Sequence, residues 1–154
     1  MKIIKLLCIA GLIFGLCSSA LAEQAKRIAT IAEVNGTVEV KIGKQNWVPA
    51  KVGIELNQGD FIRTRKDSFA LLNLDGQAQT ATVEVKENSQ MRLAELIENQ
   101  KEGTQTTLLD LALGEILIQA KKLHSEKSRF EVKTPTSIVG VRGTTFSVTV
   151  EAVE

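Results

Sequence analysis

Cysteine, histidine and aromatic residues are scarce in this chain of 154 residues. It holds two cysteines, one histidine, one tryptophan, five phenylalanines and no tyrosine. Both cysteines, Cys8 and Cys17, lie in an apolar stretch at the N-terminus, so the rest of the chain forms neither a disulfide nor a thiolate metal site. Its stability must therefore come from the burial of apolar side chains.

Long hydrophobic runs are also scarce, and the longest lies at the N-terminus. Two lysines precede an uncharged apolar run from Leu6 to Leu16, and Ala20-Leu21-Ala22 offers small residues at the two recognition positions of a cleavage site. The run is shorter than the roughly 20 residues that a membrane-spanning helix needs. We therefore expect residues 1–22 to be a signal peptide cleaved after Ala22, and residues 23–154 to form one domain that is periplasmic or secreted and has no membrane span after processing.

A strong excess of charge of either sign is absent. The chain has 19 Lys and Arg residues against 18 Asp and Glu residues. Cleavage after Ala22 removes Lys2 and Lys5, which leaves a net charge of about −1. Binding to nucleic acid or to an anionic membrane surface needs a net basic surface, so the composition argues against both as partners.

Recognisable catalytic and metal-binding motifs are absent as well. The single histidine, His124, lies in the charged and polar stretch from Lys121 to Ser128, which is most simply a solvated loop and not a metal site. The glycines are spaced like turn residues, and they form neither a nucleophile elbow nor a phosphate-binding loop. We predict that the protein is not an enzyme and needs no metal or cofactor. An unrecognised hydrolase of envelope polysaccharide remains as an alternative, because the chain has many carboxylates.

What the chain does contain is a regular alternation of apolar and polar residues. From Ile28 onward this period of two is broken about every 8 to 12 residues by Gly, Asn or Asp, which is typical of short strands joined by turns. Asn35-Gly36 and Asp75-Gly76 are turn dipeptides of the hairpin type. The pattern predicts an all-β fold of short antiparallel or coiled strands, a β-roll or solenoid-like sandwich rather than a closed barrel.

The inward-facing positions of these strands give the predicted core, which comprises Val38, Val40, Ile62, Leu72, Leu74, Val83, Leu93, Leu111, Ile116, Ile118, Val132, Phe146 and Val148. Apolar residues are absent between Glu98 and Thr106, which predicts a flexible loop. Residues alternate on either side of Gly114, which favours two strands that meet there at a turn or bend over a short helix from Thr107 to Leu113. A last strand ends at Val150, so either the gene product is longer or this edge pairs with a partner.

The segment from Val132 to Phe146 carries a pattern that is too specific for a generic strand pair. It reads Val-Lys-Thr-Pro-Thr-Ser-Ile-Val-Gly-Val-Arg-Gly-Thr-Thr-Phe. This closely resembles the signature of the FecR domain family, in which a strand ending in Thr-Pro leads to a Val-Arg-Gly-Thr-x-Phe run. Earlier segments resemble the family in the same order, namely 34–38, 47–50 with Gly53, and the Leu-x-x-Gly-Asp-x-Ile-x-Thr step at 56–64.

The resemblance implies an extracytoplasmic β-rich domain, known best from membrane-spanning regulators of sigma factors, where it receives a signal from an outer-membrane receptor. In those regulators a sigma-binding segment and a membrane helix precede the domain, whereas a signal peptide is predicted here. We therefore expect a free-standing, non-enzymatic module of the cell envelope that binds a protein partner or a cell-wall glycan. A role in sigma-factor and iron-uptake signalling beside a separate membrane partner is the alternative.

Structural and binding roles are both open for the residues of this pattern. The structural signature comprises Thr134, Pro135, Gly140, Val141, Arg142, Gly143, Thr144 and Phe146, with Gly59 and Asp60 from the earlier step. We expect Gly140 and Gly143 to adopt φ values that a Cβ would forbid, so that the loop between them bends tightly. The Arg142 guanidinium then bonds to carbonyls of the turns or to a carboxylate such as Asp60, or it presents its donors to an anionic group of a ligand.

Thr144 and Trp47 join Arg142 as candidate binding residues. The threonine hydroxyl suits a sugar, but threonine is also simply a good strand and turn residue. The indole either stacks on a sugar ring or packs at the core or its rim.

Overall fold

The structure is a computed structural model that describes residues 24–76, 79–123 and 125–151. The predicted signal peptide and His124 lie outside the described residues. The described part of the chain consists of strands and turns and contains no helix. The strands are β1 (Gln24–Lys26), β2 (Ala29–Asn35), β3 (Val38–Lys41), β4 (Val48–Pro49), β5 (Glu55–Leu56), β6 (Phe61–Thr64), β7 (Phe69–Leu74), β8 (Ala81–Val85), β9 (Gln90–Asn99), β10 (Thr104–Ala120), β11 (Arg129–Lys133), β12 (Ile138–Val141) and β13 (Thr145–Val150).

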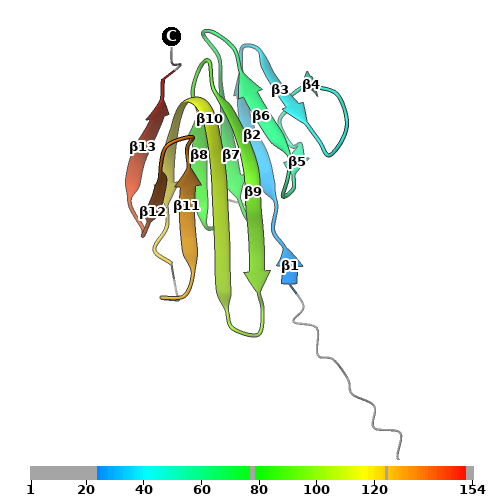
Figure 1. The fold of residues 1–154 in the computed structure, drawn as a ribbon. Coiled ribbons are helices and arrows are strands. Elements are labelled where there is room, and N and C mark those ends of the chain that lie inside the picture. The colour runs from blue at the N-terminus through cyan, green and yellow to red at the C-terminus, as the bar shows by residue number, and fades with distance from the viewer. Residues whose placement is uncertain (1–23, 77–78, 124, 152–154) are drawn as a thin grey trace, which may run out of the picture.

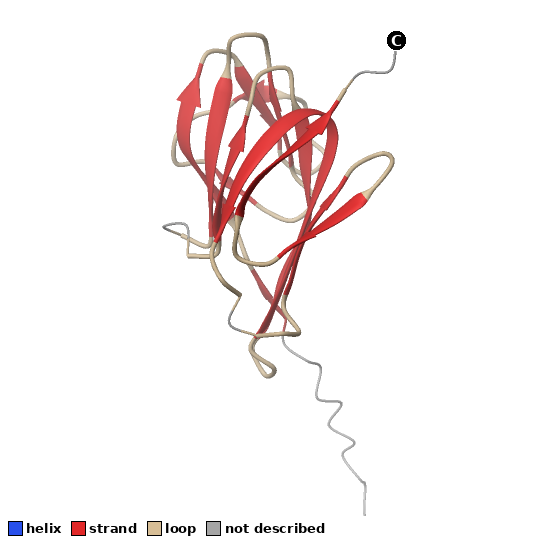
Figure 2. Cartoon of the chain, turned by 90° about the vertical axis from the view of Figure 1, so that its left-hand side faces the viewer, coloured by secondary structure: helices blue, strands red, loops and turns tan. Residues whose placement is uncertain are grey.

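These strands form one curled, 13-stranded sheet whose two halves face each other (Figures 1 and 2). Half I consists of β1, β3, β4, β6, β9, β11, β12 and the first part of β10. Half II consists of β2, β5, β7, β8, β13 and the second part of β10. All neighbours are antiparallel except β10 and β11, which run parallel. The predicted all-β fold is confirmed.

Strand β10 belongs to both halves and bends where it passes between them. Its residues up to Leu113 pair with β9, and those from Gly114 onward pair with β8 and β13. Gly114 has φ +91°, and a Cβ added to it would lie 2.1 Å from Ser89 Oγ and 2.5 Å from Ser89 Cα. Strand is therefore confirmed over helix, but the prediction of two separate strands is wrong, because the glycine bends one strand of 17 residues without ending it.

The predicted flexible loop between Glu98 and Thr106 is also wrong. Strand β9 continues to Asn99, β10 begins at Thr104, and the two pair directly, so that the turn between them is short. The backbone here is flanked by β1 on the outside of β9 and by β11 on the outside of β10. Hydrogen bonds of the main chain hold a strand whatever the polarity of its side chains, which is why the polar sequence misled the prediction.

Three turns carry the chain between the halves and stack on one another, as in a solenoid. They lie at residues 36–37, 65–68 and 86–89. Ser68 Oγ accepts a hydrogen bond from the N–H of the preceding turn, 2.8 Å from Thr37 N. Ser89 Oγ accepts one from the N–H that follows Gly114, at 2.9 Å. Each small buried serine thus links its own turn to the neighbouring layer.

One cluster of buried apolar side chains from both halves fills the interior. All the predicted core residues are buried except Phe146, which is only half-buried. Phe146 lies on β13, which pairs with β10 on one side and with no described strand on the other. The missing neighbour leaves one side of the phenyl ring open to solvent.

Candidate functional site

The signature segment, residues 132–146, runs from the end of β11 through β12 to the start of β13, on the open side of the sheet between its halves (Figure 2). Thr134 closes the first connection with its own side chain. Its Oγ1 accepts a hydrogen bond from Ser137 N at 3.0 Å and donates one to Ser137 O at 3.2 Å. Pro135 and Thr136 are thereby held at the tip of a β11–β12 hairpin.

The two glycines of the signature have different roles. Gly143 has φ +62°, and a Cβ added to it would lie 2.9 Å from Lys122 Cα, so the loop packs directly against the chain that follows β10. Gly140 lies within β12, does not have positive φ, and has open space where a Cβ would be. The expectation of a forbidden φ at Gly140 is therefore wrong, because a regular extended strand supplies its conformation.

Arg142 is exposed and reaches across to the segment that precedes β11. Its Nη2 donates a hydrogen bond of 2.6 Å to the carbonyl of Glu126. The suggested pairing with Asp60 is wrong, because Asp60 is buried elsewhere and accepts bonds of 2.8 Å from Gly43 N and Asn57 N. Asp60 and Gly59, which has φ +95°, shape the turn before β6.

The Arg142 side chain lines two hollows of the surface. One of about 310 Å³ is lined by Arg142, Lys122, Leu123, Ser125 and Glu126. Another, of about 400 Å³, lies between the start of β11 and the end of β12 and again includes Arg142 and Glu126. Arg142 remains exposed although it lines both hollows. The N–H donors of its guanidinium that do not bond to Glu126 are therefore accessible to a partner.

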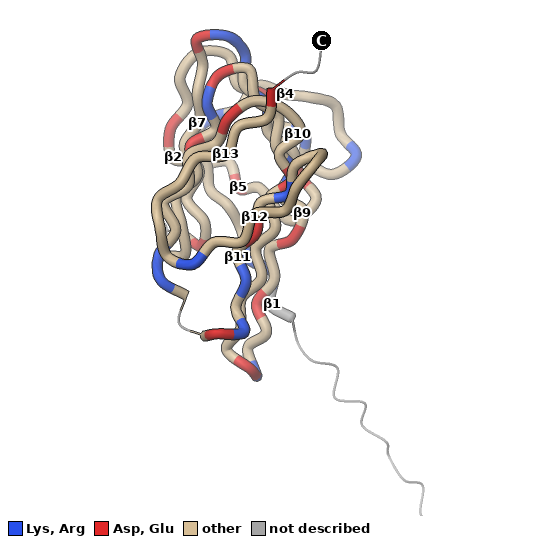
Figure 3. Tube along the Cα trace, turned by 60° about the vertical axis from the view of Figure 1, so that its left-hand side comes forward, with Lys and Arg blue, Asp and Glu red and all other residues tan. Residues whose placement is uncertain are grey.

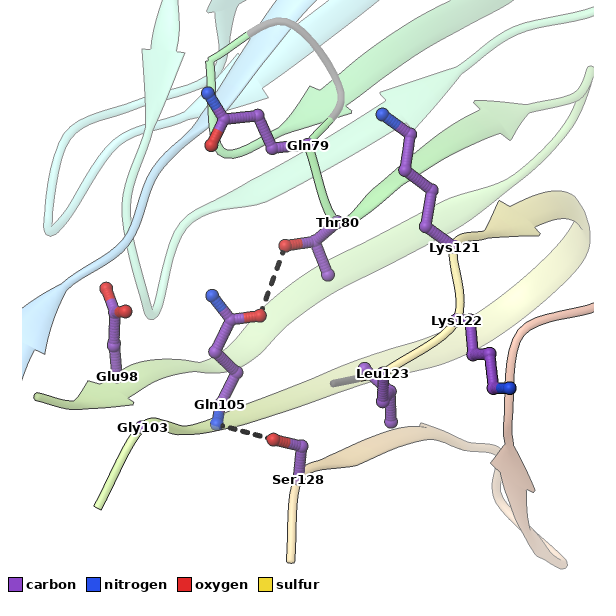
Figure 4. A pocket seen from close by; sticks show the side chains of 9 residues that line it. All are labelled: Gln79, Thr80, Glu98, Gly103, Gln105, Lys121, Lys122, Leu123 and Ser128. Atoms are coloured by element: carbon purple, nitrogen blue, oxygen red, sulfur yellow. Dashed lines mark hydrogen bonds between the residues drawn. The ribbon is translucent and has the colours of Figure 1, made fainter. Parts of the chain in front are cut away.

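A polar pocket of about 210 Å³ adjoins the first hollow and shares Lys122 and Leu123 with it (Figure 4). Gln105 lies between Thr80 and Ser128: the Thr80 hydroxyl is 3.4 Å from Gln105 Oε1, and Gln105 N donates to Ser128 Oγ at 3.0 Å. Lys121 and Glu98 stand on different sides of this central group (Figure 4). The lining offers amides, hydroxyls and charges of both signs to a hydrophilic ligand.

A buried ion pair that the sequence did not reveal is joined to this pocket through Thr80, one of its lining residues. The Arg27 side chain is 3% exposed, and its Nε lies 2.9 Å from Asp75 Oδ1. Its Nη1 also donates to Thr107 Oγ1 at 2.9 Å, and Asp75 accepts the hydroxyl hydrogen of Thr80. Arg27 and Asp75 are 48 positions apart, and no local spacing signals that they meet.

Trp47 and Thr144, the other candidate binding residues, are not brought together. Trp47 directly precedes β4, which is an edge strand of half I at the margin away from β13 (Figure 1). The guanidinium carbon of Arg63 lies 4.1 Å from the centre of its ring, and Phe61 meets it edge-on at 6.3 Å. Thr144 is exposed beside Arg142, and its carbonyl accepts a hydrogen bond of 3.1 Å from Ala120 N.

Metal-binding clusters and membrane-spanning helices are both absent from the described residues. Within them, no group of three or more His, Cys, Asp or Glu side chains is placed to hold a metal ion. Residues 24–151, apart from the gaps given above, likewise contain no helix that is long and apolar enough to cross a membrane.

Comparison with known proteins gives one kind of match. A family model described as "FecR protein" matches residues 60–153, which is more than half of the chain. The matched range includes the segment 132–146 and begins at Asp60. The resemblance at 34–38, at 47–50 with Gly53 and at 56–59 therefore lies outside it. Searches of curated proteins and of solved structures found no match.

Proposed function

Because the chain belongs to the FecR family, we propose that it is an extracytoplasmic, non-enzymatic sensing module of the bacterial cell envelope that binds a protein partner. In this proposal residues 1–22 are the cleaved signal peptide, and residues 23–154 form the exported domain. The family is one of signalling domains, which supports a role in transmission of a signal rather than in catalysis. As an alternative within this proposal, the module takes part in sigma-factor signalling together with a separate membrane partner.

The observation that carries the proposal is that Arg142 is exposed and lines two hollows of the surface. A guanidinium carries five N–H donors, so a single hydrogen bond leaves most of them without a partner. Among the described residues, Arg142 makes one hydrogen bond, to the Glu126 carbonyl, and that bond orients the side chain without enclosing it. Lys122 lines the same hollow. The pair suits a carboxylate on a partner, since charge-assisted bonds to a guanidinium are strong and directional.

A second candidate, binding of a cell-wall glycan, is favoured by the polar pocket around Gln105. Its amides and hydroxyls match the hydrogen-bonding needs of sugar hydroxyl groups. Trp47 contributes less to this candidate, because the Arg63 guanidinium already lies over one face of its ring.

Capture from intact envelopes with an Arg142→Ala variant tests the proposal. We expect cross-linked recovery of the partner to fall about tenfold or more, the effect of losing a charge-assisted hydrogen-bonded contact, while the melting temperature is unchanged. Arg65→Ala, which removes an exposed arginine from the turn after β6, is the matched control and should leave recovery unaltered.

The identity of the captured material separates the alternatives. A membrane regulator or receptor would support signalling, and glycan lost on Gln105→Ala would support the second candidate. Release of soluble sugar from the glycan would instead indicate the hydrolase. Undiminished capture by Arg142→Ala would exclude the proposed role of this residue.

A further inference from the structure

Strand β13 is an edge without the features that normally protect edges. On one side it pairs with β10 from Thr145 to Val150, without a register shift, and on the other it meets no described strand. Its sequence is Thr-Phe-Ser-Val-Thr-Val, which contains no charge and no proline (Figure 3). Natural proteins usually place lysine, proline or a bulge on such an edge to prevent pairing with another chain. The free side of β13 therefore remains open to a further strand.

The hydrogen bond from Ala120 N to Thr144 O fixes which groups face that free side. In an antiparallel pair, residues alternate between those that bond to the neighbour and those that point away from it. Thr144 and every second residue after it therefore direct their N–H and C=O groups toward β10; these residues are Thr144, Phe146, Val148 and Val150. The N–H and C=O groups of Thr145, Ser147 and Thr149 consequently point outward from the sheet.

The side chains of β13 repeat this alternation across the two faces. Phe146, Val148 and Val150 pack toward the core, while Thr145, Ser147 and Thr149 are exposed on the outer face. No residue of the strand itself is charged, and exposed Arg142 stands before it and exposed Glu151 after it. The Ser147 hydroxyl donates to Glu115 Oε1 of β10 at 2.9 Å, and this carboxylate is paired with Lys86 at 3.4 Å. The strand thus has a positive residue at one end and a negative residue at the other.

We propose that the occupant of this edge is β13 of a second copy of the chain, paired antiparallel with Ser147 opposite Ser147. Thr145 of each copy then lies opposite Thr149 of the other, so all three residues with outward backbone groups find partners. Phe146 lies opposite Val148 on the core face, and the Arg142 end of each copy lies alongside the Glu151 end of the other.

Three features of the edge favour a second copy over an unrelated strand. First, the twofold axis brings the positive end of each strand to the negative end of the other. Second, apolar side chains lie opposite apolar side chains on the core face, and hydroxyl side chains lie opposite hydroxyl side chains on the outer face. Third, in the same register the outward N–H and C=O groups of one strand lie opposite those of the other. A shift by one residue would place core-facing side chains opposite outward-facing ones and is disfavoured. Because a single strand pair is a small interface, the dimer should be concentration-dependent. This inference does not depend on the proposed function.

The first test exchanges the end charges. We expect Glu151→Arg alone and Arg142→Glu alone to weaken dimerisation by about threefold to tenfold in sedimentation equilibrium, since each homodimer then places like charges together. An equimolar mixture of the two variants should restore association, because both contacts of the mixed dimer become attractive. No recovery in the mixture would overturn the proposed register.

The second test addresses the strand itself. Ser147→Pro removes an N–H that faces the free side while leaving the bonds to β10, and it should abolish dimerisation, whereas Ser147→Ala should not. If Ser147→Pro does not fold, Thr149→Lys, which places a charge beside Thr145 of the partner, takes its place.

Hydrogen exchange of the unaltered protein gives an independent readout. The amides of Thr145, Ser147 and Thr149 should gain protection as concentration rises, while that of Val148 stays protected throughout. A monomer at all concentrations, or a dimer that survives Ser147→Pro or Thr149→Lys, would overturn the inference. Because these measurements use the purified chain alone, their failure leaves the partner-binding proposal intact.

Discussion

At the scale of single residues, the outer face of half I is organised by one carboxylate. Glu39 on β3 accepts a hydrogen bond from Arg63 Nε at 2.7 Å and another from Arg65 Nη2 at 3.1 Å. Arg63 in turn lies over the ring of Trp47. The hydrogen bond from Arg63 lowers the pKa of the Glu39 carboxyl group, assisted by the charges of both arginines, and this outweighs the partial burial that raises it. The glutamate thus orients the arginine that covers the indole.

We expect the Glu39 interaction to stabilise the fold only above acid pH. Its pKa is lower when folded than when unfolded, so the unfolded chain takes up the proton first as the pH falls. The stabilisation is therefore complete at neutral pH and is lost progressively below the ordinary glutamate pKa of about 4.3. In urea titrations between pH 7 and about pH 3, the free energy of unfolding of Glu39→Gln should depend less on pH than that of the unaltered protein. Glu102→Gln, an exposed change in the β9–β10 turn, is the control, and equal flattening by both variants would contradict the assignment.

At the scale of elements, β10 determines how the sheet is divided. Its first part lies between β9 and β11, and its second part lies between β8 and β13. The bend at Gly114 rotates the strand from one half to the other, and the close approach of Ser89 leaves no space for a side chain there. The Ser89 hydroxyl also contacts the backbone at this bend, since it accepts a hydrogen bond from Glu115 N and lies within donating distance of Glu115 O. One tight contact therefore joins the β8–β9 turn to the bend.

Gly114→Ala should destabilise the protein by about 3 kcal/mol or more, because strain at positive φ adds to a clash with Ser89. Gly53→Ala is the matched control: Gly53 has a similar φ, +88°, but open space around it. It should lose only about 1–2 kcal/mol. Chemical denaturation of both variants measures the difference. Equal losses would show that the contact with Ser89 relaxes freely.

At the scale of the whole molecule, both halves share one core and one central strand. The buried cluster includes residues from Ala29 to Val148 in the sequence, and both halves of the sheet contribute side chains to it. The buried Arg27–Asp75 ion pair is linked to the polar pocket by the hydrogen bond that Asp75 accepts from Thr80. Neither half has a separate core to keep it folded without the other. The two halves should therefore unfold together.

Leu72→Ala tests this cooperativity from half II, while the tryptophan reports from half I. Leu72 is fully buried on β7, so its truncation should cost about 2–5 kcal/mol. The fluorescence of Trp47 and the far-ultraviolet circular dichroism should shift to the same lower denaturant midpoint. The control is Val52→Ala at a position that is 64% exposed, where the change should stay within about 0.5 kcal/mol. Separate midpoints for the two signals would contradict a single cooperative unit.

The sequence by itself determined the β fold, nearly all of the core and the family. Alternation with a period of two depends only on which side chains face inward, so Val38 and Ile62 were assigned to the core without any knowledge of their neighbours. The signature was recognisable for a related reason, because its glycines, threonines and proline act within a few residues of one another. Thr134 bonding to Ser137 is an example of such a local contact.

Only the tertiary structure decided which distant residues meet. It joined Arg27 to Asp75, directed Arg142 to the Glu126 carbonyl and not to Asp60, and made Thr104–Ala120 one strand instead of a loop and two strands. It also left the outer side of β13 without a neighbour among the described strands. These outcomes depend on strand order and register, which arise from packing of the whole sheet, and a polar residue carries no local mark of the partner that packing will bring to it.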